Sequence, residues 1–188
     1  MVDRFIITGL PRSRTSWLAN LFTYGSSLCM HDGLTHGKDF FNWLELMRVS
    51  DPRIRHMGNS DSGIPLAFEA APEDVKVVVV QRNWMDCMVS FRKYFSQHPY
   101  THLGMVNADV EGPAIQAIFQ NAREKLTSFM DTVKPGLLKV VDFADLNDPD
   151  AVESMWNFLV PDEPFSWARW QILDKLRVNP ASEKVRMS

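Results

Sequence analysis

The sequence predicts one α/β domain with three layers, in which a central parallel sheet of about five strands is flanked by helices. Two observations predict this class. Residues 4–8 and 75–80 form short, largely apolar runs rich in β-branched residues, as is typical of strands covered by helices on both faces. Each run is followed at once by a helical pattern. A chain of 188 residues suits one such domain, which we expect to span residues 1–188.

The first strand and the first helix are joined by a tight turn. Gly9 and Pro11 end the strand near residue 8. Apolar residues then recur at spacings of three and four over residues 17–22, which predicts one buried helical face. Ser13 or Thr15 can cap this helix, so we expect it to begin inside the turn.

The turn has the composition of an anion-binding site. A helix N-terminus offers free N–H donors and a partial positive charge. Arg12, Arg14, Thr15 and Ser16 add cationic and hydroxyl donors. The nucleotide-binding loop G-x-x-x-x-G-K-[ST] is the nearest general motif, but its second Gly and its Lys are missing here, which argues against an ATPase or a GTPase. We therefore expect the turn to hold a phosphate in another way.

A second group of donors follows the strand predicted at residues 75–80. Arg82 should lie at the carboxyl end of that strand. Residues 84–91 are predicted to be helical, with Asn83 near the helix start and Ser90 farther along it.

These two segments resemble the donor-binding motifs of the sulfotransferases, in particular the small bacterial or phage type. Residues 11–17 match the pattern P-[KR]-S-G-T-[TS]-W at all but one position, where Arg14 replaces Gly. Arg82 and Ser90 keep the eight-residue spacing of the family's 3′-phosphate motif. The resemblance implies a P-loop NTPase-like fold. It also implies transfer of a sulfuryl group from 3′-phosphoadenosine 5′-phosphosulfate (PAPS) to a hydroxyl or amine, leaving 3′-phosphoadenosine 5′-phosphate.

The resemblance also assigns roles to single residues. Arg12 would contact the leaving group, Thr15 and Ser16 would hold the 5′-phosphate, and Trp17 would stack on the adenine. Arg82 and Ser90 would bind the 3′-phosphate that distinguishes PAPS from ATP. No metal is required. The residues expected to bind the nucleotide are Arg12, Ser13, Arg14, Thr15, Ser16, Trp17, Arg82 and Ser90.

Three residues are candidates for the catalytic base. Residues 28–30 resemble the end of a second strand, and His31 and Asp32 follow it, where open α/β sheets gather their ligands. We rank His31 first, and Asp32 next as a base or as the group that orients His31. His56 is the rival, because some sulfotransferases carry a catalytic His near the corresponding place. Residues 58–63 are expected to help shape the acceptor site.

The rest of the chain fits the same fold. Residues 136–143 are predicted to form a late strand, and residues 114–134 and 152–159 two helices. Residues 96–113 are predicted to form a long loop that could cover the acceptor. Residues 179–188 are expected to fray.

Composition narrows the setting. The net charge of −3 offers no general attraction to nucleic acid. Two cysteines, Cys29 and Cys87, cannot define a disulfide framework. No apolar run is long enough to span a membrane, and no signal peptide is recognised, so we expect a cytoplasmic protein. The chain is shorter than many sulfotransferases, which predicts a small or carrier-borne acceptor. Two alternatives stay open: a P-loop kinase of small molecules, and a non-catalytic nucleotide-binding module with the same fold.

Overall fold

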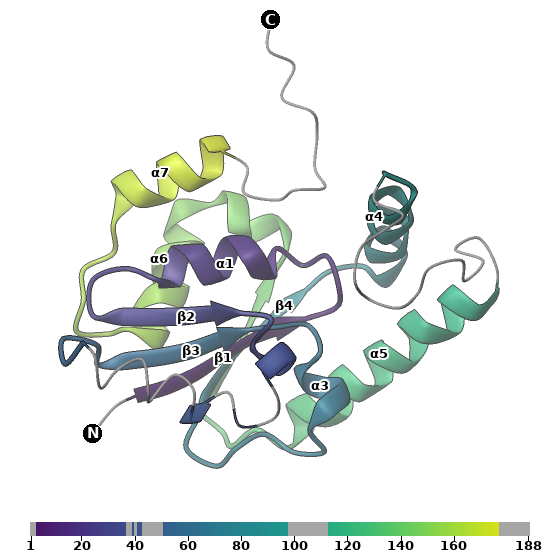
Figure 1. Cartoon of the computed structure of the whole chain (residues 1–188), viewed down its shortest axis with the longest axis horizontal. Coiled ribbons are helices and arrows are strands. Elements are labelled where there is room, and N and C mark those ends of the chain that lie inside the picture. The colour runs from purple at the N-terminus through teal and green to yellow at the C-terminus, as the bar shows by residue number, and fades with distance from the viewer. Residues whose placement is uncertain (1–2, 37–38, 40, 43–50, 98–112, 177–188) are drawn as a thin grey trace, which may run out of the picture.

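Five parallel strands form the centre of the computed structural model, which describes residues 3–36, 39, 41–42, 51–97 and 113–176 (Figure 1). The strand order is β2-β3-β1-β4-β5, and every neighbouring pair is parallel. The predicted fold class is confirmed. The strands are β1 (Asp3–Gly9), β2 (Ser27–His31), β3 (His56–Ser60), β4 (Lys76–Gln81) and β5 (Leu138–Asp142).

Helices cover both faces of this sheet. Figure 1 shows α1, α6 and α7 along one face and α3 and α5 along the other. None of the described helices is both long and apolar enough to cross a membrane. The helices are α1 (Thr15–Phe22), α3 (Ile64–Ala67), α4 (Trp84–Gln97), α5 (Pro113–Asp131), α6 (Pro149–Leu159) and α7 (Trp167–Leu176), with short 3-10 turns η1 (Gly33–His36) and η2 (Ala144–Asn147).

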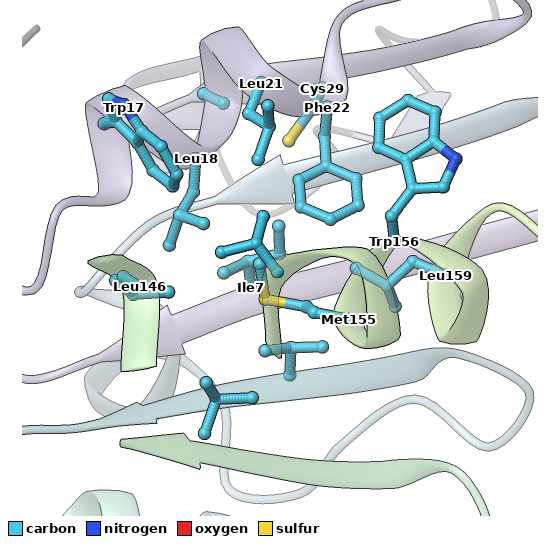
Figure 2. Close-up of a cluster of buried hydrophobic side chains, with 14 of the residues drawn as sticks. Ile7, Trp17, Leu18, Leu21, Phe22, Cys29, Leu146, Met155, Trp156 and Leu159 are labelled. Carbon is cyan, nitrogen blue, oxygen red and sulfur yellow. The ribbon is translucent and has the colours of Figure 1, made fainter. Parts of the chain in front are cut away.

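The first hydrophobic cluster lies between the sheet and the α1, α6 and α7 layer (Figure 2). Phe5 and Ile7 of β1 point into it, and neither is exposed. The rings of Phe22 and Trp156 stack with centroids 5.2 Å apart, which ties α1 to α6. Aromatic pairs of this kind stabilise by about 0.5–1.5 kcal/mol beyond their buried area.

The second cluster lies on the opposite face. Ile6 of β1 and Val77 and Val79 of β4 pack there against Phe119 and Phe129 of α5. Alternate residues of one strand therefore enter different clusters. This explains why residues 4–8 and 75–80 are apolar almost throughout, and why their pattern predicts central strands.

Several elements were not predicted, β3 and α7 among them. No strand is predicted at β3, because His56–Ser60 contains no run of β-branched residues. It lies between β2 and β1, and the ring of Phe5 lies over Gly58, where a side chain would otherwise stand. α7 was also missed, since its apolar residues follow no clear helical period. The loop predicted at residues 96–113 and the tail at 179–188 fall largely or wholly outside the described residues.

All five strands run in one direction, so their carboxyl ends share one edge of the sheet. The candidate site is built on that edge. The last residues of the strands are Gly9, His31, Ser60, Gln81 and Asp142.

Candidate functional site

The turn after β1 has the strained backbone of a tight anion-binding loop. Arg12 and Arg14 both adopt left-handed conformations, with φ of 74° and 60°. Gly9 begins the turn where a Cβ would lie 2.6 Å from the carbonyl oxygen of Val80, so any larger residue would push the turn away from β4. A left-handed φ is cheapest for glycine. This accounts for the Gly that the sequence motif prefers at the position of Arg14.

The Arg14 side chain extends over aromatic rings instead of capping the helix. Its guanidinium carbon lies 5.2 Å from the ring centroid of Phe143 and 5.8 Å from that of Trp17. No side-chain hydrogen bond caps α1 at Arg14. The first turn of α1 thus leaves backbone N–H groups that a bound anion can use.

Two hydroxyls of this loop meet the histidine at the end of β2. The Nε2 atom of His31 lies 2.9 Å from Ser16 Oγ and 3.3 Å from Thr15 Oγ1. Ser60 Oγ donates to the Thr15 carbonyl oxygen at 2.9 Å, which anchors the loop to β3. Three strand ends therefore contribute to one cluster of polar atoms.

Ser13 differs from its two neighbours. Its side chain is fully buried, and its Oγ would lie 3.4 Å from a Cβ placed on Gly9. Ser13 thus packs on the inner side of the turn, near the Cys87 thiol, whose pKa burial raises to about 11. Among the expected nucleotide ligands, Ser13 can contribute its backbone but not an exposed hydroxyl.

Arg82 connects the second donor group to the first. Its Nη1 donates to the carbonyl oxygen of Arg12, and its guanidinium lies 4.0 Å from the ring centroid of Phe143. Arg12 Nε lies 3.5 Å from Ser90 Oγ, and the Arg12 guanidinium lies 4.6 Å from the ring centroid of Tyr94. The structure thus brings Arg12, Arg82 and Ser90 together. Sequence reasoning missed both aromatic supports.

Arg12 and Arg82 place two positive charges close together. Burial lowers the pKa of the Arg12 guanidinium, and the neighbouring Arg82 lowers it further. A guanidinium nevertheless stays charged at neutral pH. Two adjacent positive charges repel each other, and a bound anion would relieve that repulsion.

His31 has an acidic neighbour. Its Nε2 lies 3.3 Å from Asp32 Oδ1, and both side chains are partly exposed. Burial raises the pKa of the Asp32 carboxyl, the His31 charge opposes this, and Asp61 raises it further. Asp32 also has a positive φ of 51°, so the chain turns sharply at the end of β2.

Asp61 holds the turn that follows β2, a role that the sequence did not reveal. Its side chain is 5% exposed and accepts backbone N–H groups from Leu34, at 3.1 Å, and Gly63, at 2.7 Å. These bonds fix η1 beside His31. The only sequence signal for this role of Asp61 was its place in the polar segment 58–63. That signal becomes clear only once it is known that β3 ends at Ser60.

His56 lies at the other edge of the sheet. His56 is the first residue of β3, whereas the loop with Arg12 follows the last residue of β1. Because β1 and β3 are parallel, the two lie at opposite ends of the strands. His56 is 2% exposed, and its Nε2 lies 2.5 Å from Asp162 Oδ1. The structure therefore does not bring His56 to the other candidates. The rival base predicted at residue 56 thus lies away from the loop, because residue 56 begins a strand, which the sequence did not show.

Trp17 also differs from expectation. Its side chain is 3% exposed and packs in the first hydrophobic cluster (Figure 2). A ring with so little free surface has no face open to an adenine. The helical pattern of residues 17–22 already indicated a buried stripe, and for Trp17 the core role is the one that the structure has.

We expect Trp17→Ala to lower the free energy of unfolding by about 3–5 kcal/mol, because it empties a large core site. Urea unfolding followed by circular dichroism measures this. Trp17→Phe fills much of the space and should keep nucleotide affinity within about threefold, since aromatic volume, not stacking, is what the site needs. A large loss of affinity in a well-folded Trp17→Phe protein would restore the stacking role.

No metal centre accompanies these groups in the part of the chain that the structure describes. There, no cluster of three or more His, Cys, Asp or Glu side chains is arranged to hold an ion. The positive charge at the site comes from arginines and from the helix N-terminus.

Comparison with known proteins relates this architecture to solved structures. No protein-family model matches the sequence, and no curated protein matches it either. A sulfotransferase from Alicyclobacillus acidocaldarius superposes with a TM-score of 0.60 at 14% identity, over 88% of this chain and 85% of the other.

Two further structures are similar. A sulfotransferase domain from the curacin biosynthetic pathway gives a TM-score of 0.57 at 12% identity, covering 90% of this chain and 77% of that domain. The mouse sulfotransferase SULT7A1, complexed with PAP, gives 0.53 at 14% identity, covering 92% of this chain and 64% of the other. All three share the fold described above.

Proposed function

We propose that this chain, which has the fold of the sulfotransferases, transfers a sulfuryl group from PAPS to a hydroxyl or amine of a small or carrier-borne acceptor. The likeness to three sulfotransferases supports this at the level of the fold. The observation that carries the proposal is the hydrogen bond from Arg82 to the Arg12 carbonyl. It brings together two donor groups that are 70 residues apart in the sequence.

The donor set fits a nucleotide with phosphates at both ends. On one side, Arg12, Thr15, Ser16 and the start of α1 offer cationic, hydroxyl and backbone donors for a 5′-phosphosulfate. On the other, Arg82 makes no ion pair within the described part of the chain, so its charge is available to a 3′-phosphate. One of the similar structures is itself a complex with PAP.

The chain's own side chains can perform the remaining steps. PAPS would supply the activated sulfuryl group. Arg12 stabilises the negative charge that develops on the leaving phosphate oxygen, and its permanent charge makes it a cation there and not a proton donor. His31 accepts the acceptor's proton at Nε2, which already faces the loop hydroxyls. Asp32 Oδ1 lies 3.3 Å from the same nitrogen, so its carboxylate would stabilise the ring once Nε2 carries the proton.

Calorimetric titration with 3′,5′-adenosine bisphosphate and with ADP tests the proposal. We expect the bisphosphate to bind at least tenfold more tightly, since a charge-assisted hydrogen bond contributes about 1.5–3 kcal/mol. Arg82→Ala and Ser90→Ala should reduce this ratio. Arg53→Ala is the control, because Arg53 is exposed and bonds to Asp51 away from the loop.

Other outcomes separate the alternatives. Equal affinities that neither substitution changes would contradict the proposal, and tighter binding of ATP with magnesium would favour a kinase. A labelled-sulfate transfer assay over a panel of hydroxyl and amine acceptors distinguishes an enzyme from a non-catalytic module, which would bind the bisphosphate and transfer nothing.

A further inference from the structure

A cavity of about 560 Å³ opens at the carboxyl end of β4. Arg82 and Asn83 line it from the end of the strand, Leu10 from the turn after β1, and Arg123 from α5. It is therefore continuous with the candidate site through Arg82, which touches the loop and lines the cavity as well. Nothing in the proposed function above uses Arg123.

Arg123 lines this cavity and has no side-chain partner among the residues that the structure describes. Its side chain forms no hydrogen bond or ion pair with any residue that the structure describes. Thr127, one turn further along α5, also lines the cavity, but its Oγ1 donates to the Arg123 carbonyl at 3.1 Å. The Thr127 hydroxyl therefore already donates its hydrogen to the backbone. Arg123 is the cationic donor that α5 provides to the cavity.

The charge balance of the cavity favours an anion. Two arginines and one carboxylate, Asp142, line it, which leaves a net positive charge. Asp142 forms no ion pair with either arginine, so neither guanidinium is neutralised there. Arg82 is fixed by Phe143 and by the Arg12 carbonyl, and a guanidinium has five N–H donors, so several remain for a ligand.

We propose that Arg123 completes the 3′-phosphate site, binding the phosphate together with Arg82. The proposal rests on the proposed function, because it assigns the same nucleotide. A phosphate monoester carries close to two negative charges at neutral pH, and two guanidinium groups neutralise it where one leaves a charge unpaired. Preference for a 3′-phosphorylated nucleotide then depends on a strand end and on a helix that begins more than 30 residues later in the chain.

Titration of Arg123→Ala with 3′,5′-adenosine bisphosphate and with ADP tests this. We expect bisphosphate affinity to fall about tenfold and ADP affinity to stay within about twofold, because ADP has no 3′-phosphate. Lys125→Ala is the matched control: it removes an exposed cation two positions along α5, on another face of the helix. It should change neither affinity.

The double variant Arg82→Ala/Arg123→Ala should lose most of the preference for the bisphosphate, because only Ser90 of the three groups remains. If Arg123→Ala keeps the wild-type ratio of the two affinities while Arg82→Ala loses it, the assignment of Arg123 is wrong and the proposed function stands. If the wild-type protein does not prefer the bisphosphate, the proposed function and this inference both fail. If Arg123→Ala lowers the affinities for the bisphosphate and for ADP by the same factor, the assignment of Arg123 is also wrong, because such a result indicates a general electrostatic effect.

Discussion

His31→Asn should lower kcat for sulfuryl transfer by about 100- to 10,000-fold, the range over which a positioned acid or base acts. Asn keeps a polar, uncharged side chain but cannot take a proton. The expectation follows from position: His31 Nε2 lies 2.9 Å from Ser16 Oγ, in the loop expected to hold the donor. Transfer of labelled sulfate at saturating PAPS, with an acceptor from the panel, measures the effect.

Two controls make this result specific. The affinity of His31→Asn for 3′,5′-adenosine bisphosphate should stay within about fivefold, which shows that the site is intact. His56→Gln should retain kcat while losing stability, since His56 is buried beside Asp162 at the far edge of the sheet. A His31→Asn enzyme with near-normal kcat would refute the assignment, and a His56→Gln enzyme that folds but does not turn over would restore the rival.

The fold was predictable because its two central strands are buried on both faces. β1 and β4 place alternate residues in opposite clusters, so both faces select apolar side chains and the pattern is continuous. β3 had no such signal. Apart from the buried Met57, its residues are polar or small: Phe5 fills the space over Gly58, and Ser60 anchors the loop. The Phe5 side chain of the neighbouring strand β1 thus requires a glycine in β3. This contact cannot be recognised from a single sequence.

The candidate donor-binding residues were found through residue type and spacing. The motif spacing paired Arg82 with Ser90; in the structure Ser90 Oγ lies 3.5 Å from Arg12 Nε, and Arg82 reaches the loop through the Arg12 carbonyl. Arg123 carried no signal, because on an amphipathic helix it is one of several exposed charges. Only the packing of α5 against the sheet brings it beside Arg82.

The same reasoning explains why Trp17 and His56 lie elsewhere than the sequence predicted. At the position of Trp17, a ring that stacks on a ligand and a ring that packs in the core would leave the same helical pattern in the sequence. Only the burial of the side chain in the structure distinguishes the two roles. His56 was misplaced because a histidine that follows a strand and one that begins a strand lie at opposite edges of a parallel sheet. Strand bounds, which sequence patterns set least accurately, therefore decide which residues belong to the site.

Gly58→Ala should destabilise the fold by about 3 kcal/mol or more, at the upper end of the range for overpacked cores. A Cβ at this position would lie 2.0 Å from Phe5 Cε2. Phe5 cannot move aside easily, since it is fully buried and its ring centroid lies 5.7 Å from that of Phe22. Urea unfolding measures the change. Gly136→Asn is the control, because Gly136 has a φ of +83° and open space where a Cβ would stand, and Asn tolerates that conformation.

The clash also predicts a rescue. Combining Gly58→Ala with Phe5→Leu should recover part of the loss, because the smaller side chain makes room for the methyl group, and a double-mutant cycle would show favourable coupling. Unfolding midpoints that simply add would contradict the contact. The site should respond as well: β3 holds the loop through the hydrogen bond from Ser60 to the Thr15 carbonyl, so Gly58→Ala should weaken bisphosphate binding in whatever fraction still folds. A mostly polar strand of five residues thereby links the packing of the core to the geometry of the turn after β1.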